Sequence, residues 1–248
     1  MNSAFPLMLG CLILFGILEN LFPFFAFKQS WISRISTNFA LGILNAAITA
    51  LVFAALLKWV LPQTNWSGLF HGVQPVWLVG VVSFLLLDIY RYGWHVLMHM
   101  WPLGWRFHRV HHTELTMNIS TAYRFHFVEV LFSNFPRVFL IWLFGINPVC
   151  VFIYEAAFAA VEVFQHSNWA IPLKVDKVLT YLIVTPNFHR VHHSQIVKET
   201  NSNYSSLLTI WDRLFGTYRY IRNPRTLKIG LVEEPRPLDI RKLLTLPF

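Results

Sequence analysis

Most of the histidines in this sequence fall into groups whose spacing could bind metal. There are 11 histidines in 248 residues, and eight of them form one pair four residues apart and two copies of the pattern His-x-x-His-His. These eight are His95 and His99; His108, His111 and His112; and His189, His192 and His193. On a helix, positions three and four apart share a face, so each group can direct its imidazoles at one point. Because neutral imidazole is a common metal ligand, the spacing predicts a metal site.

Repetition of the pattern argues against an accident of composition. The pentapeptide His-Arg-Val-His-His occurs identically at 108–112 and at 189–193. At this histidine content, His-x-x-His-His is expected by chance only about 0.02 times in a chain of this length. Two copies therefore favour a shared function over histidines scattered through a core or a surface.

The histidine count also narrows the kind of metal site. A structural zinc site usually has four ligands, commonly thiolates, and eight clustered histidines exceed one tetrahedral site. The two cysteines, Cys11 and Cys150, lie in apolar stretches without zinc or redox spacing. A carboxylate-bridged di-iron bundle would show Glu-x-x-His repeats, and none occurs near these groups. A histidine-rich dinuclear site remains.

The composition places this site in a membrane protein. Hydrophobic residues make up 55% of the chain and charged residues only 13%, whereas about a quarter of a soluble domain is charged. The net charge of +8 does not indicate nucleic acid, because 12 of the 20 Lys and Arg lie in residues 166–248 among six acids. That placement is typical of a region facing lipid headgroups on the cytoplasmic side.

The elements that must position the histidines are apolar helices. We expect an all-α integral membrane bundle of four to five membrane-embedded helices, forming one domain over residues 1–248. The expected spans are 5–27, 37–59, 75–99, 127–145 and 148–165, with a histidine-rich cap formed by 100–126 and 166–248. The first span has no basic segment before it and no small-residue cleavage site after it, so we interpret it as a retained helix.

Loop charges predict the orientation of the bundle. Lys28 and Arg34 follow the first span, residues 61–74 carry no charged side chain, and Arg106, Arg109 and Arg124 follow the third span. Under the positive-inside rule, the basic loops are cytoplasmic and the N-terminus is outside. The histidine groups would then lie at the cytoplasmic ends of the spans.

Several further motifs accompany the histidines in a fixed order. They are Asp88; His95-x-x-x-His99; His108-Arg-Val-His-His112-Thr-Glu114; Arg124-x-His126-x-x-Glu129; Gln165-His166-Ser-Asn168; Thr185-Pro186-Asn-x-His189-Arg-Val-His-His193; Asn203-Tyr204; and Trp211-Asp-Arg-Leu-Phe-Gly-Thr-Tyr218. This order resembles the fatty acid hydroxylase superfamily, specifically its sterol desaturase-like branch of membrane di-iron oxygenases. The chain departs from the usual pattern at Val96, Phe127, Asn201 and Ser205, which are not box histidines and bear on the substrate.

The resemblance implies an enzyme that uses O2 to hydroxylate or desaturate a lipid C–H bond, such as that of a fatty acyl chain or a sterol. It implies two iron ions bound by His95, His99, His108, His111, His112, His166, His189, His192 and His193. Zinc could occupy the site in purified protein, because it binds nitrogen ligands more tightly than ferrous iron does. The chain has neither a Gly-rich dinucleotide motif nor a haem-attachment motif, so a separate electron donor is expected.

Five other residues are expected to support the ligands rather than to carry out the chemistry: Asp88, Glu114, His126, Glu129 and Asn168. Asp88 could orient a ligand imidazole or pair with Arg91, and Glu114 and Glu129 could orient imidazoles too. His126 could be a ligand or could pair with Arg124 or Glu129. His71 stands alone in a loop and is expected to have no role.

Two other classes of function are compatible with the histidines alone. A metal transporter or a non-redox zinc protein would place its ligands at mid-bilayer depth and show an internal repeat, whereas only the pentapeptide repeats here. A metal-dependent hydrolase would need a carboxylate base beside the metal, and Glu114 is the nearest candidate.

Overall fold

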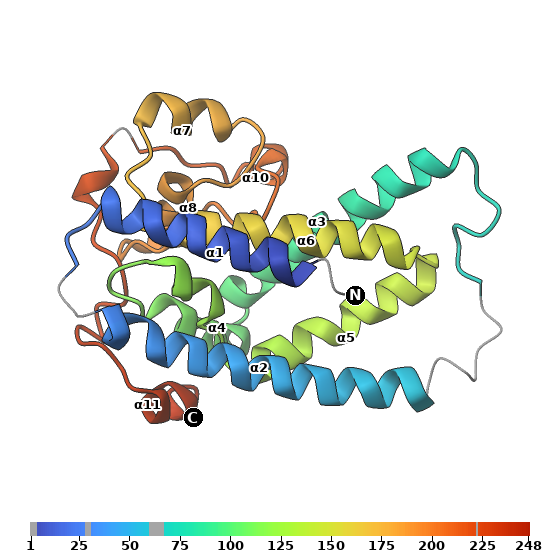
Figure 1. The fold of residues 1–248 in the computed structure, drawn as a ribbon, viewed down its shortest axis with the longest axis horizontal. Helices are drawn as coiled ribbons and strands as arrows, with labels where there is room; N and C mark the ends of the chain where they lie inside the picture. Colours follow the sequence, from blue (N-terminus) through green and yellow to red (C-terminus); the bar gives the residue numbers. More distant parts are fainter. Residues whose placement is uncertain (1–3, 28–30, 60–66, 222) are drawn as a thin grey trace.

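Long helices dominate the computed structural model, which describes residues 4–27, 31–59, 67–221 and 223–248. The long helices are α1 (Ala4–Leu21), α2 (Trp31–Trp59), α3 (Val76–Met100), α5 (Phe127–Phe144) and α6 (Pro148–His166). In Figure 1 they extend along the length of the molecule, with α3 and α5 inclined to α1, α2 and α6. Within the described residues there is no strand, only three isolated bridges. The predicted all-α bundle is confirmed.

Four of these helices are long and apolar enough to cross a membrane. They are α2, over its window Ile35–Val52, and α3, α5 and α6 over their full lengths, while α1 contributes a shorter apolar segment, Pro6–Leu21. Large apolar side chains are exposed on their outer faces, among them Ile13, Phe132, Phe139 and Ile153. An apolar exterior on helices whose backbone bonds are satisfied internally is what a bilayer requires.

The short helices gather at one end of the bundle, on the left in Figure 1. They are α4 (Pro102–His112), η2 (Ile119–Tyr123), α7 (Leu173–Leu179), α8 (Pro186–His192), α9 (Val197–Thr200), α10 (Ile210–Leu214), η3 (Pro224–Thr226) and α11 (Ile240–Thr245). All of them belong to the two segments expected to form the cap. Polar side chains fill much of this end, in contrast to the lipid-facing surface of the long helices.

The first helix is shorter than the expected span of 5–27. It ends at Leu21, just before Phe22-Pro23, because a proline disfavours helical geometry in the residue before it. The chain that follows binds the cap instead of continuing through lipid: the Phe24 backbone N–H donates to the Asn168 carbonyl at 2.7 Å, and Phe22 O accepts from Ala170 N at 2.8 Å. Phe24 also lies under the guanidinium of Arg190, 4.0 Å from its ring centre.

The turn between α5 and α6 forms a helical hairpin from the expected spans 127–145 and 148–165. Gly145 ends α5 with φ of 64°, a left-handed conformation that favours glycine. A Cβ at this position would lie 2.4 Å from the Ser67 carbonyl oxygen, so no larger residue fits. Asn147 caps α6 by accepting from Val149 N at 2.8 Å. The hairpin returns the chain to the cap end, where α6 finishes at His166.

Candidate metal centre

A sharp turn between α3 and α4 brings the first two histidine motifs together. Trp101 lies between the helices and Pro102 opens α4, where its missing N–H costs nothing. Gly104 then packs against α3 so closely that a Cβ would lie 2.9 Å from the Met98 side chain. The tight turn lets α4 fold back along the end of α3, so that their histidines face each other.

The structure assembles nine histidines into two groups that could each hold a metal ion. In each group, the candidate ligand atoms lie within 4.8 Å of one another. The first group, called here the five-histidine group, contains His95, His99, His108, His112 and His192. The second, the four-histidine group, contains His111, His166, His189 and His193. Together they contain all nine of the expected ligands and no other histidine.

The two identical pentapeptides are shared between the groups in opposite ways. The first and last histidines of 108–112 join the five-histidine group, and the middle one, His111, joins the other. At 189–193 the first and last histidines join the four-histidine group, and His192 joins the five-histidine group. Helical geometry explains the division, because positions i and i+4 lie about 40° apart around the axis and i+3 lies on the other side of i.

Distances between ring nitrogens match ligands of a metal ion. In the four-histidine group, His166 Nε2 lies 3.1 Å from His111 Nε2 and 3.0 Å from His189 Nε2, which is 3.1 Å from His193 Nε2. In the five-histidine group, His95 and His108 approach at 3.1 Å through the same atoms. At a metal–nitrogen distance of about 2.1 Å, two ligands at right angles are about 3.0 Å apart.

Unpaired nitrogens support the same interpretation. The Nε2 atoms of His99, His112 and His192 are buried and have no hydrogen-bond partner in the described part of the chain. A buried polar atom without a partner costs free energy, and a bound cation would remove that cost. The residues present therefore fit a metal.

Hydrogen bonds at the outer nitrogens set the orientation of the five-histidine group. Four of its five Nδ1 atoms lie next to oxygen acceptors: Tyr204 O at 2.7 Å from His95, Asn201 Oδ1 at 3.3 Å from His99, Glu129 Oε1 at 2.7 Å from His108, and Ser202 O at 2.8 Å from His192. An Nδ1–H that donates to such an oxygen leaves the Nε2 lone pair free for a metal.

Burial keeps five histidines of the cap in the neutral form. The pKa values of His111, His112, His189, His192 and His193 lie well below the ordinary value, first because burial disfavours the charged imidazolium and then because neighbouring histidines repel it. Neutral imidazole is the form that binds metal. The cap thus provides ligands that do not have to lose a proton near neutral pH.

Of the residues expected to support the ligands, Glu129 contacts one of them and Asp88 does not. Glu129 is buried and bonds to His108. Asp88 instead accepts from Trp211 Nε1 at 2.7 Å, Leu208 N at 3.2 Å and Tyr154 OH at 3.2 Å. The expected bond from Asp88 to an imidazole is therefore replaced by bonds that attach α3 to residues 208–211. Arg91 pairs with Glu155, at 2.9 Å.

The other three supporting candidates lie outside both histidine groups. Glu114 accepts from Asn38 Nδ2 at 3.0 Å. His126 caps α5 through Val128 N at 3.2 Å and has its Nε2 3.3 Å from the Leu244 carbonyl, instead of pairing with Arg124 or Glu129. The Asn168 side chain accepts from Phe25 N at 3.0 Å and donates to Phe25 O at 2.8 Å. The isolated His71 is exposed in its loop.

Sequence reasoning missed the role of segment 201–204, which supplies the hydrogen-bond acceptors for three of the histidines. Two of its acceptors, Ser202 O and Tyr204 O, are backbone carbonyls, so no residue type could reveal them. Asp212 fixes this segment, because its carboxylate accepts from Tyr204 N at 2.8 Å and Ser205 N at 2.9 Å. The signal available was the cluster of motif residues at 203–212, which the resemblance marks without saying what they do.

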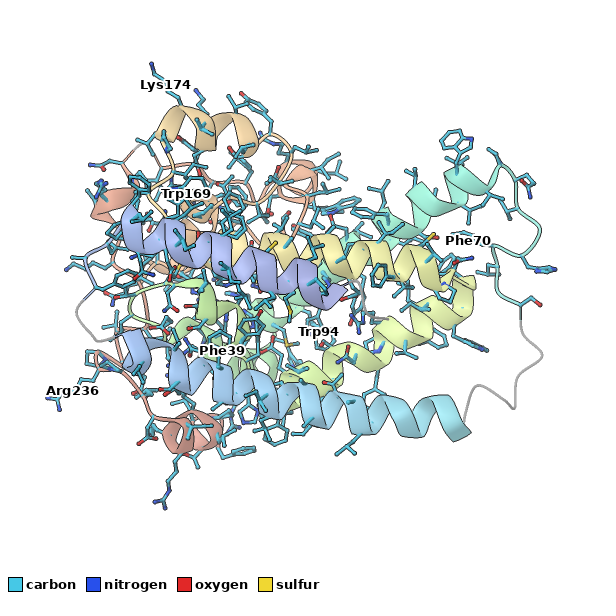
Figure 2. All side chains as sticks on the ribbon, viewed as in Figure 1. Phe39, Phe70, Trp94, Trp169, Lys174 and Arg236 are labelled. Carbon is cyan, nitrogen blue, oxygen red and sulfur yellow. The ribbon has the colours of Figure 1, made fainter. Side chains whose placement is uncertain are left out.

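A cavity of about 340 Å³ opens beside the histidines. Members of both groups form one end of its wall: His95 and His108 from one, and His111, His166 and His189 from the other. Apolar and aromatic side chains line much of the rest, including Phe125, Val130, Phe158 and Trp94, which is labelled in Figure 2. A site next to both candidate metal positions can hold a ligand of moderate size away from water.

Comparison with known proteins agrees with this geometry. The family model described as fatty acid hydroxylase matches residues 80–217, which include all nine histidines. Ornithine lipid hydroxylase OlsE of Rhizobium tropici is 32% identical over 200 residues, covering 80% of this chain and 56% of that protein. Alkylglycerol monooxygenase of Xenopus tropicalis is 32% identical over 142 residues (55% of this chain, 30% of that protein), and cholesterol 25-hydroxylase of Mus musculus is 27% identical over 149 residues (59% and 49%).

The chain thus spans about half or less of the length of these relatives. No solved structure gives a significant match to it. The family model, in contrast, covers more than half of the chain, and its match runs from α3 to the segment after α10. The chain belongs to the fatty acid hydroxylase family.

Proposed function

We propose that this protein is a membrane enzyme that uses O2 to hydroxylate a lipid C–H bond at a centre of two iron ions. The observation that carries the proposal is the meeting of two histidine groups at one end of a largely apolar cavity. The names of the relatives describe hydroxylation or monooxygenation of an ornithine lipid, an alkylglycerol and cholesterol. These names favour hydroxylation over desaturation.

The five-histidine group would hold one iron and the four-histidine group the other. Bound iron would supply the activation of dioxygen, which no amino-acid side chain provides. The choice of iron rests on family membership, since imidazoles also suit zinc. Nine imidazoles, with the carboxylates of Glu129 and Glu162 beside His108 and His166, would give the centre a nitrogen-rich ligand set unlike that of carboxylate-bridged di-iron proteins.

The protein's own residues would position and shield the reaction. The oxygen atoms of Tyr204, Ser202 and Glu129 hold the imidazoles in one tautomer, so that the ligands need not reorganise during turnover. Phe125 stacks on the His111 ring at 4.3 Å and closes one side of the centre. The cavity would hold the substrate with its reacting carbon beside the histidines and with bulk water excluded.

We further propose that the centre faces the cytoplasm and takes electrons from a separate protein. The basic loops support this orientation. Cysteines placed one at a time at Lys174, whose side chain extends away from the cap in Figure 2, and at His71 should label from opposite sides of the membrane, in protein lacking Cys11 and Cys150. Labelling of both from the same side would contradict the orientation.

The test of function is iron-dependent oxygen consumption coupled to a hydroxylated lipid. Protein purified with iron should contain about two metal ions per chain. With a lipid extract and a chemical or protein electron donor, it should consume O2 and add one oxygen atom to a lipid, as seen by mass spectrometry. Metal transport without oxygen consumption would support the transporter alternative. Lipid cleavage without oxygen would support a hydrolase, although Glu114 already binds Asn38.

A further inference from the structure

Two arginines from the long apolar helices line the cavity. Arg91 belongs to α3 and Arg137 to α5, and both side chains contribute to the cavity wall. Each lies inside a helix that is long and apolar enough to cross a membrane. Ionisable side chains at such positions are costly, and they commonly mark the path or binding site of a polar group. A cavity for a purely apolar chain would not need them.

The two arginines share a single carboxylate. Arg91 Nη2 lies 2.9 Å from Glu155 Oε2, and Arg137 Nη1 lies 2.6 Å from Glu155 Oε1. Among the described residues that form the cavity wall, both arginines are present and Glu155 is not. Two positive charges therefore border the cavity, and the carboxylate that pairs with both of them lies outside its wall.

The remaining carboxylates of the wall are bound closer to the histidines. Glu129 bonds to His108 at 2.7 Å. Glu162, one helical turn before His166, accepts from Gln165 Nε2 at 2.6 Å. The cavity thus has a histidine end that contains these carboxylates, of which Glu162 also attracts Arg91, and an arginine end where Arg137 contributes positive charge.

Arg137 has the donors that an acidic group needs. Its Nη1 is used by Glu155, and its Nε is buried without a hydrogen-bond partner in the described part of the chain. The edge formed by Nε and Nη2 is the one that binds a carboxylate or phosphate with two parallel hydrogen bonds. Nε of Arg91 is buried and unpaired in the same way.

The helices fix how far this positive end lies from the histidines. Arg91 precedes His95 by four residues, about 6 Å along the helix axis, and Arg137 follows Glu129 by eight residues, about 12 Å. An acidic group held by the arginines would therefore lie several carbon–carbon bonds from a carbon placed at the histidines.

We propose that the cavity binds a lipid with an acidic group, a carboxylate or a phosphate, and that Arg137 together with Arg91 binds this group and thereby selects the carbon that lies at the histidines. The selection of a carbon rests on the proposed function, whereas binding of the acidic group does not. Arg137 is thus a specificity-determining residue of the substrate site.

Binding of matched probes tests this site without turnover. Oleate and methyl oleate differ only in whether the carboxylate is free, and 1-oleoyl-lysophosphatidate and monooleoylglycerol form the corresponding phosphate pair. Metal-loaded protein in a neutral detergent should bind at least one acid about tenfold more tightly than its neutral partner, by equilibrium dialysis. The pair that shows the preference identifies the carboxylate or the phosphate. Equal affinities within both pairs would overturn the proposal.

Two variants then separate binding from a purely structural ion pair. Arg137→Gln leaves Glu155 paired with Arg91, so the fold should persist, but the preference for the acid should fall to about twofold or less. Glu155→Gln removes the shared counter-charge, so acid binding should stay the same or become tighter. If the three residues only hold the helices together, one of two results is expected. Either Arg137→Gln keeps the preference for the acid, or Glu155→Gln loses this preference as much as Arg137→Gln does. Each of these results would refute the site.

The proposed function can fail separately. If wild-type protein prefers the acid but shows no iron-dependent oxygen consumption, the acid site is supported and the proposed hydroxylase function is refuted. If it hydroxylates a lipid but shows no preference for the acid, the function is supported and the acid site is refuted.

Discussion

The two histidine groups use the same kind of ligand but are held in place differently. In the five-histidine group, the outer nitrogens of His95, His99, His108 and His192 lie against oxygen acceptors. In the four-histidine group only His166 has such an acceptor, the Glu162 carbonyl at 2.8 Å. The Nδ1 atoms of the other three, His111, His189 and His193, are buried without a partner in the described residues.

This difference indicates that hydrogen bonds position the first group and packing positions the second. Segment 201–204 supplies acceptors to the first group, and Asp212 and Asp88 anchor the chain on either side of Leu208. The second group depends on close ring contacts, such as the 4.3 Å stacking of His111 on Phe125. The first metal position should therefore respond to changes at distant hydrogen-bonding residues, and the second to loss of its own ligands.

The largest effect should come from the middle histidines of the two pentapeptides. His111→Ala and His192→Ala should each abolish turnover, because both metal positions are needed. Their metal contents should differ: His111→Ala leaves three histidines in its group and should bind about one metal per chain, whereas His192→Ala leaves four and should keep more. Elemental analysis with the Mössbauer spectrum of iron-loaded protein distinguishes the two. His71→Ala should match the wild type; equal loss in all three variants would refute the assignment.

A smaller effect is expected from Glu129→Gln. The change weakens the bond to Nδ1 of His108 and so should lower turnover about 10–100-fold, with most of the metal retained, as is typical for a group that orients a ligand. Steady-state oxygen consumption measures the change. Glu114→Gln is the matched control, because Glu114 bonds to Asn38 rather than to a histidine. If both variants lose the same activity, the loss comes from the fold and not from His108.

The sequence predicts the candidate ligands better than it predicts the residues that bind them. Helical spacing alone predicts the ligand groups, since positions three and four apart must share a face. His166 has no such partner nearby and is identified only by the resemblance. Glu129 is likewise suggested only as one of several carboxylates. Its contact with His108 becomes visible when α4 folds back toward α5.

The partners of Asp88 could not be predicted, because they come from remote parts of the chain. Its shortest hydrogen bond joins it to Trp211, 123 residues later, and local sequence offered only Arg91 and the nearby histidines. The predicted end of the first span is wrong for a related reason. Apolar composition does not distinguish Phe24 packed under Arg190 from a phenylalanine facing lipid, so the sequence predicts a span that includes residues that bind the cap.

A change at Asp88 tests the difference between the two histidine groups indirectly, through the segment that binds the five-histidine group. Asp88→Asn removes the charge and leaves one acceptor oxygen for three donors, Tyr154 OH, Leu208 N and Trp211 Nε1, which should cost about 1–3 kcal/mol in the free energy of unfolding. Segment 201–204 should loosen with it. We therefore expect the signal of the five-histidine position to broaden in the Mössbauer spectrum while that of the four-histidine position stays unchanged. Changes confined to the four-histidine position would contradict the division into hydrogen-bonded and packed groups.

The smallest effect should come from changing His126. This histidine is close in sequence to the motif 108–112 but lies outside both histidine groups. His126 caps α5 and packs beneath the C-terminal residues, with Phe248 at 6.0 Å from its ring. Loss of such a cap typically costs about 1 kcal/mol. His126→Gln should therefore lower the unfolding temperature slightly, leave both metal positions filled and keep nearly full turnover. If it instead loses metal to the same extent as His111→Ala, then His126 is a ligand and the set of nine histidines is incomplete.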